Sequence, residues 1–210
     1  MLKGIILAGG YGTRLDPITK AISKQLIPVY DKPLIYYPLS TMIEAGIKDI
    51  LIITRPDNKE SFQSLLGNGE NFGINISYTV QQKPAGIAQA FILGKQFIKN
   101  SNVMLILGDN IFYGIDFEKI NEKIKTKNFG SIIFSFFVEN PERYGVVKYS
   151  KNKILKIVEK PKKFISNHAI TGIYYFDKNI VNYSKIIKPS KRNELEIIDI
   201  INIYNKNKKL

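Results

Sequence analysis

Three glycines and an arginine lie close together near the start of the chain, directly after a short apolar run. Residues 7–15 read LAGGYGTRL. Glycine lets the backbone approach an anion closely, and the planar guanidinium of Arg14 can bind a phosphate with several donors. The segment is not a P-loop, which needs Gly-Lys-Ser/Thr, nor a dinucleotide fingerprint, because Leu15 replaces the third glycine. We predict a phosphate-binding loop; a tight turn after a strand is the alternative that these residues leave open.

A second candidate is the acidic residue Asp109, which follows the very apolar residues 103–107 in the sequence Gly-Asp-Asn. A carboxylate at such a position could hold Mg²⁺ against phosphate oxygens, because Mg²⁺ prefers a few carboxylates together with oxygens of the substrate. The alternative is an ordinary Asp-Asn turn, which these two residue types also favour.

Residues 80–90, VQQKPAGIAQA, contain a possible reader of a nucleobase. The amide of Gln81 presents a donor and an acceptor side by side, which suits the imide edge of a pyrimidine. Gly86 would let the base come close to the backbone. Thymine and uracil share this imide edge, so these residues do not separate the two bases. A loop leading into a helix is the alternative.

Charged residues after a later strand could bind a sugar phosphate. Glu159 could accept hydrogen bonds from sugar hydroxyls, and Lys160 could neutralise the phosphate of the sugar. An exposed, charged strand end is an equally good interpretation of this pair. His168 is the only histidine of the chain, which argues against a histidine nucleophile or a multi-histidine metal site, and we predict that it lies in a loop.

The elements that would position these residues follow from the hydrophobic pattern. Apolar runs and alternating segments predict strands at residues 2–8, 49–54, 74–80, 103–107, 131–138, 145–149, 153–158 and 170–176. The two short strands at 145–149 and 153–158 are predicted to form a hairpin. Helical patterns cover 33–45, 57–66, 86–98, 117–126 and 194–205, the second opened by a capping box of Asp57 and Glu60. Strands that alternate with helices predict an α/β fold with a mostly parallel sheet, whose ligands lie beyond the carboxyl ends of the strands.

The composition excludes several classes of protein. The 210 residues contain no cysteine, so a disulfide framework and thiol catalysis are excluded. No run of about 18 apolar residues and no signal peptide occur, so we expect a cytoplasmic protein that does not enter a membrane. The net charge of +13 would suit an anionic partner. Because the lysines are scattered through every segment and do not cluster, overall compositional bias is the preferred explanation and a nucleic-acid partner is not expected.

The motifs together resemble a known family. Residues 9–19 (GGYGTRLDPIT) and 23–28 (SKQLIP) resemble the signature of the sugar nucleotidyltransferases, and residues 29–40 (VYDKPLIYYPLS) resemble its thymidylyltransferase branch. The resemblance extends over essentially all 210 residues. It implies a single Rossmann-like nucleotidyltransferase domain with a mostly parallel, mixed sheet, a nucleotide-binding part at about 1–110 and a sugar-binding part at about 111–210. It also implies Mg²⁺-dependent synthesis of dTDP-glucose and pyrophosphate from dTTP and glucose 1-phosphate, the first step towards dTDP-rhamnose and related deoxysugars.

The resemblance also implies roles for individual residues. The residues expected to carry the reaction are Arg14, Lys24, Asp109 and Lys160, with Asp109 as the metal ligand. The nucleotide would be bound by Leu7, Gly9, Gly10, Gly12, Thr13, Gln25, Gln81 and Gly86. The sugar phosphate would be bound by Asn110, Tyr144, Gly145, Glu159, Ile170 and Tyr174.

The chain departs from the family in one respect. Members of this branch usually continue for several tens of residues, through a segment of the type Trp-x-Asp-x-Gly that supplies a second metal carboxylate, and this chain contains no tryptophan. We therefore expect that the usual C-terminal extension is absent. Asp199 is a poor substitute for the missing metal carboxylate, because it lies in a predicted amphipathic helix. Family members form homotetramers, so a homo-oligomer is expected. The alternatives are a nucleotide-binding protein with impaired catalysis and a uridylyltransferase that uses UTP.

Overall fold

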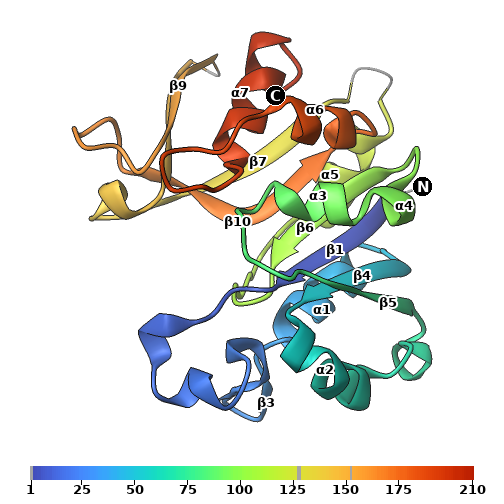
Figure 1. The fold of residues 1–210 in the computed structure, drawn as a ribbon. Helices are drawn as coiled ribbons and strands as arrows, with labels where there is room; N and C mark the ends of the chain where they lie inside the picture. The colour runs from blue at the N-terminus through green and yellow to red at the C-terminus, as the bar shows by residue number, and fades with distance from the viewer. Residues whose placement is uncertain (1, 127–128, 152) are drawn as a thin grey trace.

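The computed structural model describes residues 2–126, 129–151 and 153–210, and a mixed sheet runs through their centre (Figure 1). Within the described residues the sheet has eight strands. In spatial order seven of them are β5 (Asn75–Val80), β4 (Asp49–Thr54), β1 (Leu2–Ala8), β6 (Asn102–Leu107), β10 (His168–Phe176), β8 (Gly145–Ser150) and β9 (Lys153–Glu159), and β7 (Ser131–Phe137) pairs with β10. The first four strands are parallel, whereas β10 runs antiparallel to β6, β7 and β8. The expected mixed α/β fold is confirmed.

The register of the parallel strands decides where the loops meet. Ala8 in β1 lies opposite Thr54 in β4, and Leu7 lies opposite Leu107 in β6. The three strands therefore end at the same edge of the sheet, and the segments that follow them emerge side by side. This edge is where ligands bind in sheets of this type.

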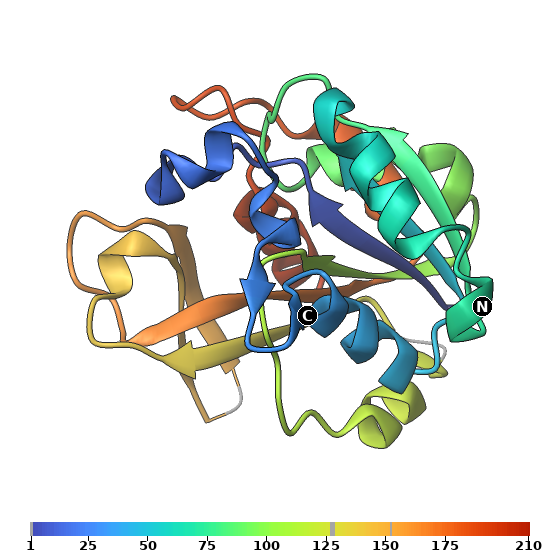
Figure 2. The same ribbon diagram turned by 90° about the horizontal axis from the view of Figure 1, so that it is seen from below.

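Helices cover both faces of the sheet because the central strands are apolar on both sides. Ile5 of β1 faces a core with α3 (Gln89–Leu93), α6 (Ile180–Ile186) and α7 (Ile197–Lys206). Its neighbour Ile6 faces a second core with α1 (Tyr36–Glu44), α2 (Lys59–Leu66) and α5 (Phe117–Ile124). Figure 2 shows these helices on the two sides of the sheet, with the segment after β1 and the β8–β9 hairpin extending towards the same end. No helix within the described residues is both long and apolar enough to cross a bilayer.

Several expected helix boundaries are wrong. The first helix begins at Tyr36 rather than residue 33, because Lys32–Pro33 forms the short strand β3, which pairs with β2 (Pro28–Val29). The predicted helix over 86–98 is divided into α3 and α4 (Lys95–Ile98), and the last helix begins at residue 197. A further helix, α6, was not predicted at all.

Two predictions about single residues are also wrong. Asp57 does not cap a helix: it lies in a 3₁₀ turn before α2, and its carboxylate binds Arg55 instead of a backbone N–H. His168 does not lie in a loop but is the first residue of β10, where it pairs with Phe137 of β7.

Candidate active site

A cavity of about 830 Å³ opens at the carboxyl ends of β1 and β6 and extends to the β8–β9 hairpin. Thirteen of the predicted site residues border it: Leu7, Gly10, Arg14, Gln81, Gly86, Asp109, Asn110, Tyr144, Gly145, Glu159, Lys160, Ile170 and Tyr174. The cavity therefore joins residues that lie more than 150 positions apart in the sequence.

Five predicted residues do not border this cavity: Gly9, Gly12, Thr13, Lys24 and Gln25. Gly9 is buried against Gln81, which borders the cavity. Gly12 and Thr13 lead into the exposed 3₁₀ turn Thr13–Leu15. Gln25 is buried and accepts a hydrogen bond from Ser23 Oγ at 2.7 Å, so its side chain is occupied within the protein.

The candidate base reader Gln81 is held rigidly. Its side chain is 2% exposed, and its Nε2 donates to Gln89 Oε1 at 2.6 Å. The same Gln89 oxygen accepts from the backbone N–H of Ala85 at 3.0 Å. A Cβ on Gly9 would lie only 1.9 Å from Gln81 Oε1. The first glycine of the loop is therefore required by the position of the Gln81 amide.

Gly86 ties the nucleotide end of the cavity to the segment before α7. Its φ is +94°, and a Cβ here would lie 2.4 Å from the backbone oxygen of Leu195. The backbone N–H of Leu195 donates to Ala85 O at 2.7 Å, and the N–H of Ala88 donates to Leu195 O at 3.2 Å. The glycine is thus needed for this close approach, whether or not a base contacts it.

Asp109, which borders the cavity, pairs with Lys24, which does not. Lys24 Nζ forms an ion pair with Asp109 Oδ2, and Asn110 Nδ2 donates to Asp109 Oδ1 at 3.0 Å. Both members of the ion pair are partly exposed. Arg14 borders the cavity nearby with an exposed side chain.

The metal ligand set is small. Among the described residues no three Asp, Glu, His or Cys side chains gather closely enough to enclose a metal ion. Asp109 alone, partly exposed and facing the cavity, suits a Mg²⁺ ion that arrives with phosphate oxygens, because Mg²⁺ needs only one or two protein carboxylates. The donor set fits an ion shared with a substrate rather than one enclosed by the protein.

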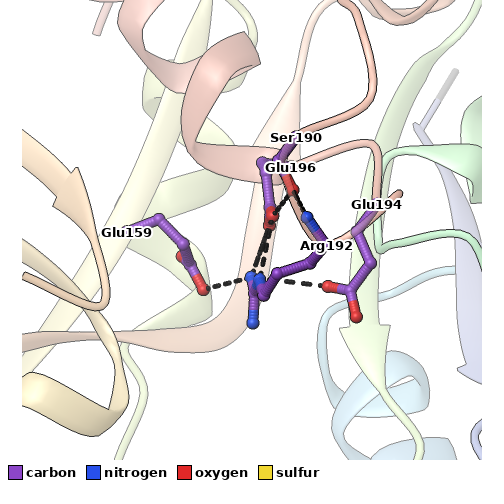
Figure 3. A network of polar contacts seen from close by, with 5 residues as sticks. All are labelled: Glu159, Ser190, Arg192, Glu194 and Glu196. Atoms are coloured by element: carbon purple, nitrogen blue, oxygen red, sulfur yellow. Dashed lines mark hydrogen bonds and ion pairs between the residues drawn. The ribbon is translucent and has the colours of Figure 1, made fainter.

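The far end of the cavity holds a cluster of charged side chains around Arg192 (Figure 3). Arg192 Nη2 donates to Glu159 Oε1 at 3.0 Å and to both carboxylate oxygens of Glu196 at 2.9 Å. Glu194 pairs with the same guanidinium at 3.4 Å, and Ser190 Oγ donates to Glu196 Oε1 at 2.6 Å. The cluster fixes the orientation of Glu159, the predicted sugar-binding carboxylate.

Burial and charge both affect the sugar end. Burial raises the pKa of Glu159 above its ordinary value, the neighbouring Glu196 raises it further, and Arg192 and Lys160 oppose the shift. Gly145 lies opposite Glu159 in the β8–β9 ladder, so both face the cavity from neighbouring strands. The backbone N–H of Lys160 donates to Tyr144 O at 2.9 Å.

Sequence reasoning missed several residues of the cavity. The missed charged residues are Arg143, Arg192, Glu194 and Glu196, and the missed aromatic ones are Phe112, Tyr113 and Phe136. The available signal was the run of charges in residues 191–196, which overlaps the start of the helix predicted over 194–205. Nothing in the spacing of these charged residues indicated that the contact between Gly86 and Leu195 would bring Arg192 to Glu159.

The chain is similar to known proteins over nearly its whole length. The sequence profile of the nucleotidyl transferase family matches residues 3–210. Glucose-1-phosphate thymidylyltransferases of Neisseria meningitidis and Mycobacterium tuberculosis are 54% and 47% identical, over 97% of this chain and 71% and 70% of their own lengths. The chain thus spans about seven tenths of these relatives.

Solved structures give the same result. A Bacillus anthracis structure in complex with sucrose, described as a glucose-1-phosphate thymidylyltransferase, superposes with a TM-score of 0.92 at 44% identity, covering 99% of this chain and 84% of that one. A UDP-glucose pyrophosphorylase complexed with UDP-glucose superposes with a TM-score of 0.85 at 28% identity, covering 100% and 89%. From the profile, the relatives and the shared fold, this chain belongs to the nucleotidyltransferase family.

Proposed function

We propose that the protein transfers the thymidylyl group of dTTP to glucose 1-phosphate, giving dTDP-glucose and pyrophosphate, as a step towards dTDP-linked deoxysugars such as dTDP-rhamnose. The curated relatives named glucose-1-phosphate thymidylyltransferase, 43–54% identical over nearly the whole chain, support thymidylyl transfer over the uridylyl alternative. The observation that carries the proposal is a single cavity with the glycine loop and Gln81 at one end and Glu159 and Lys160 at the other.

The chemistry needs no general base. A phosphate oxygen of glucose 1-phosphate, already ionised near neutral pH, forms the new bond to the α-phosphorus of dTTP. The bond from that phosphorus to the oxygen bridging to the β-phosphate breaks, and its electron pair leaves with pyrophosphate. Catalysis then consists of holding two anions in line and neutralising their charge. Only one histidine exists in the chain, and it lies outside the cavity lining.

Cationic side chains at the nucleotide end have this neutralising role in the proposal. Arg14 offers its guanidinium fork to the phosphates of dTTP and to the departing pyrophosphate. Lys24, paired with Asp109 in the free protein, turns towards the same phosphates when they enter. The family uses a divalent cation, and Asp109 would hold Mg²⁺, whose chemistry is to neutralise phosphate oxygens. The backbone of Gly10 lines the path of the phosphates, and Gly12 and Thr13, which do not border the cavity, complete the phosphate-binding loop.

Recognition of the two substrates is assigned to the ends of the cavity. Gln81 and Gly86 read the imide edge of thymine, with Leu7, Gly9 and Gln25 supporting that end. Glu159 and the backbone at Gly145 hold the hexose hydroxyls, and Lys160 steers the attacking phosphate. Asn110, Tyr144, Ile170 and Tyr174 form the remaining walls of the sugar subsite.

Three further features belong to the proposal. The chain is a single nucleotidyltransferase domain with a nucleotide part at about 1–110 and a sugar part at about 111–210. It works as a homo-oligomer, and it works in the cytoplasm. The family profile, which matches residues 3–210 without interruption, supports a single domain.

The direct test is synthesis of dTDP-glucose by the wild-type protein and by Arg14→Ala. Because Arg14 is exposed and belongs to no core, its loss should leave the thermal unfolding temperature unchanged. Turnover should fall by roughly 10² or more, the loss typical for removing one preorganised donor from a developing charge. A variant with near-normal turnover would exclude this role for Arg14. A wild-type protein that binds dTTP without making product would instead favour the catalytically impaired alternative.

A further inference from the structure

Tyr11, the one large side chain between the glycines of the loop, packs against an arginine from the next strand. The guanidinium carbon of Arg55 lies 5.0 Å from the centre of the Tyr11 ring. The pairing of Ala8 with Thr54 explains the contact, because Tyr11 and Arg55 follow these two residues past the ends of neighbouring strands. The distance lies within the range of a cation–π interaction.

Asp57 fixes the arginine in this position. Arg55 Nε donates to Asp57 Oδ1 at 3.0 Å, and Nη2 binds Oδ2, so that the guanidinium and the carboxylate meet in a two-point contact. The Arg55 side chain is only 18% exposed. Each partner favours the charged form of the other, and the pKa of Asp57 lies below its ordinary value. A bidentate pair of this kind has little freedom to rotate.

The far end of the loop is held by Thr19, whose Oγ1 donates to Gly12 O at 3.0 Å, whereas the middle of the loop has fewer restraints. Tyr11 is 54% exposed, and no hydrogen bond joins its hydroxyl to another group in the part of the chain that the structure describes. The glycines on either side contribute no side chains, and a Cβ on Gly10 would have no atom within 4 Å. The stack on Arg55 therefore holds the middle of the loop, and the Thr19 hydrogen bond holds its far end.

We propose that Tyr11, Arg55 and Asp57 form a clamp that positions the glycine loop for the phosphates of the nucleotide, so that Tyr11 and Arg55 are positioning residues for nucleotidyl transfer. The inference rests on the proposed function in one respect, that this loop binds the phosphates. A loop that is ordered before binding loses less conformational freedom when the ligand arrives, and its affinity rises accordingly. Since Arg55 and Asp57 neutralise each other, the clamp acts through geometry rather than through added positive charge.

The test is a double-mutant cycle of Tyr11→Ser and Arg55→Gln, read by the Kd of dTTP in calorimetry and by the separate KM values of the two substrates. Each single substitution should raise the Kd and KM for dTTP about two- to fivefold, the size of an exposed cation–π contact. The KM for glucose 1-phosphate should not change. The double variant should bind dTTP no more weakly than the weaker-binding single variant, because either change alone breaks the stack.

Two further variants show whether the aromatic ring at position 11 is the group that matters. Tyr11→Phe keeps the ring, so Arg55→Gln should cause the same loss in that background as in the wild type. Tyr30→Ser makes the same substitution at a tyrosine that is 96% exposed and does not border the cavity, and it should leave the Kd of dTTP unchanged.

Additive effects in the cycle, or parallel changes of both KM values, would overturn the clamp. So would a fall in unfolding temperature with no change in the Kd of dTTP. Failure of the wild-type protein to bind dTTP would instead contradict the proposed function, so the two ideas can fail separately.

Discussion

Replacing Gly9 with alanine should weaken dTTP binding by displacing Gln81. The added methyl carbon would lie 1.9 Å from Gln81 Oε1 and 3.0 Å from its Cδ, whereas non-bonded carbon and oxygen atoms need more than about 3 Å. Gly9 has backbone angles that any L-residue can adopt, so the effect comes from the contact and not from strain. The Gln81 amide must move, and its 2.6 Å bond to Gln89 must lengthen or break.

The magnitude follows from the hydrogen bonds that a displaced amide cannot make. Two bonds between the amide and the base, each worth about 0.5–1.5 kcal/mol, would be lost, for a total of about 1–3 kcal/mol. At about 1.4 kcal/mol for each factor of ten, the Kd of dTTP should rise roughly 5- to 150-fold. Overpacking of the buried site should also lower the free energy of unfolding by about 1–3 kcal/mol.

The assay is calorimetric titration of dTTP into the wild type, Gly9→Ala, Gln81→Ala and the double variant. Alanine at position 81 leaves room for the new methyl group, so the double variant should bind dTTP as weakly as Gln81→Ala and no more weakly. A double variant whose losses add would show that Gly9 acts on the nucleotide directly. An unchanged Kd in Gly9→Ala would refute the assignment of Gln81 as the base reader.

Three other outcomes follow from the geometry. Because burial raises the pKa of Glu159, this carboxylate takes up a proton at a higher pH than an exposed glutamate, and the affinity for glucose 1-phosphate should fall as the pH drops through that raised value. In Glu159→Gln the protonation of this carboxylate is missing, so the difference between the pH profiles of the wild type and the variant separates it from the titration of the substrate. Identical pH profiles would contradict the prediction. Gly86→Ala should lower the free energy of unfolding, measured in urea, by about 2–5 kcal/mol, because the φ of Gly86 is +94° and the new Cβ would lie 2.4 Å from Leu195 O. A loss below about 1 kcal/mol would show that this contact relaxes easily. Tyr204→Phe removes the buried bond to Asp177 Oδ1 at 2.6 Å and should cost about 1.5–3 kcal/mol of stability while the Kd of dTTP stays constant.

The sequence predicted the nucleotide end of the site well because that end depends on local pattern. Apolar strands followed by Gly9 and by Asp109 had to emerge at one edge of a parallel sheet, and the register of β1 with β4 and β6 confirms it. The antiparallel strands were recognised as strands, although their order in the sheet could not be inferred from alternation alone. The roles of the individual residues stay predictions.

The sugar end was predicted less completely because it depends on long-range contacts. Arg192, which reaches Glu159, lies in a segment that the N–H of Leu195 joins to Ala85, some 110 residues earlier. Helix α6 was missed because its seven residues contain β-branched and Asn side chains, which have weak helical propensity. Its stability comes from burial of Ile180 and Val181 against the sheet.

The most direct test of the central claim is pyrophosphate release by this 210-residue chain with Mg²⁺, glucose 1-phosphate and either dTTP or UTP. The account predicts turnover with dTTP that depends on glucose 1-phosphate and a lower kcat/KM with UTP. Tight binding of dTTP without any release of pyrophosphate would contradict it.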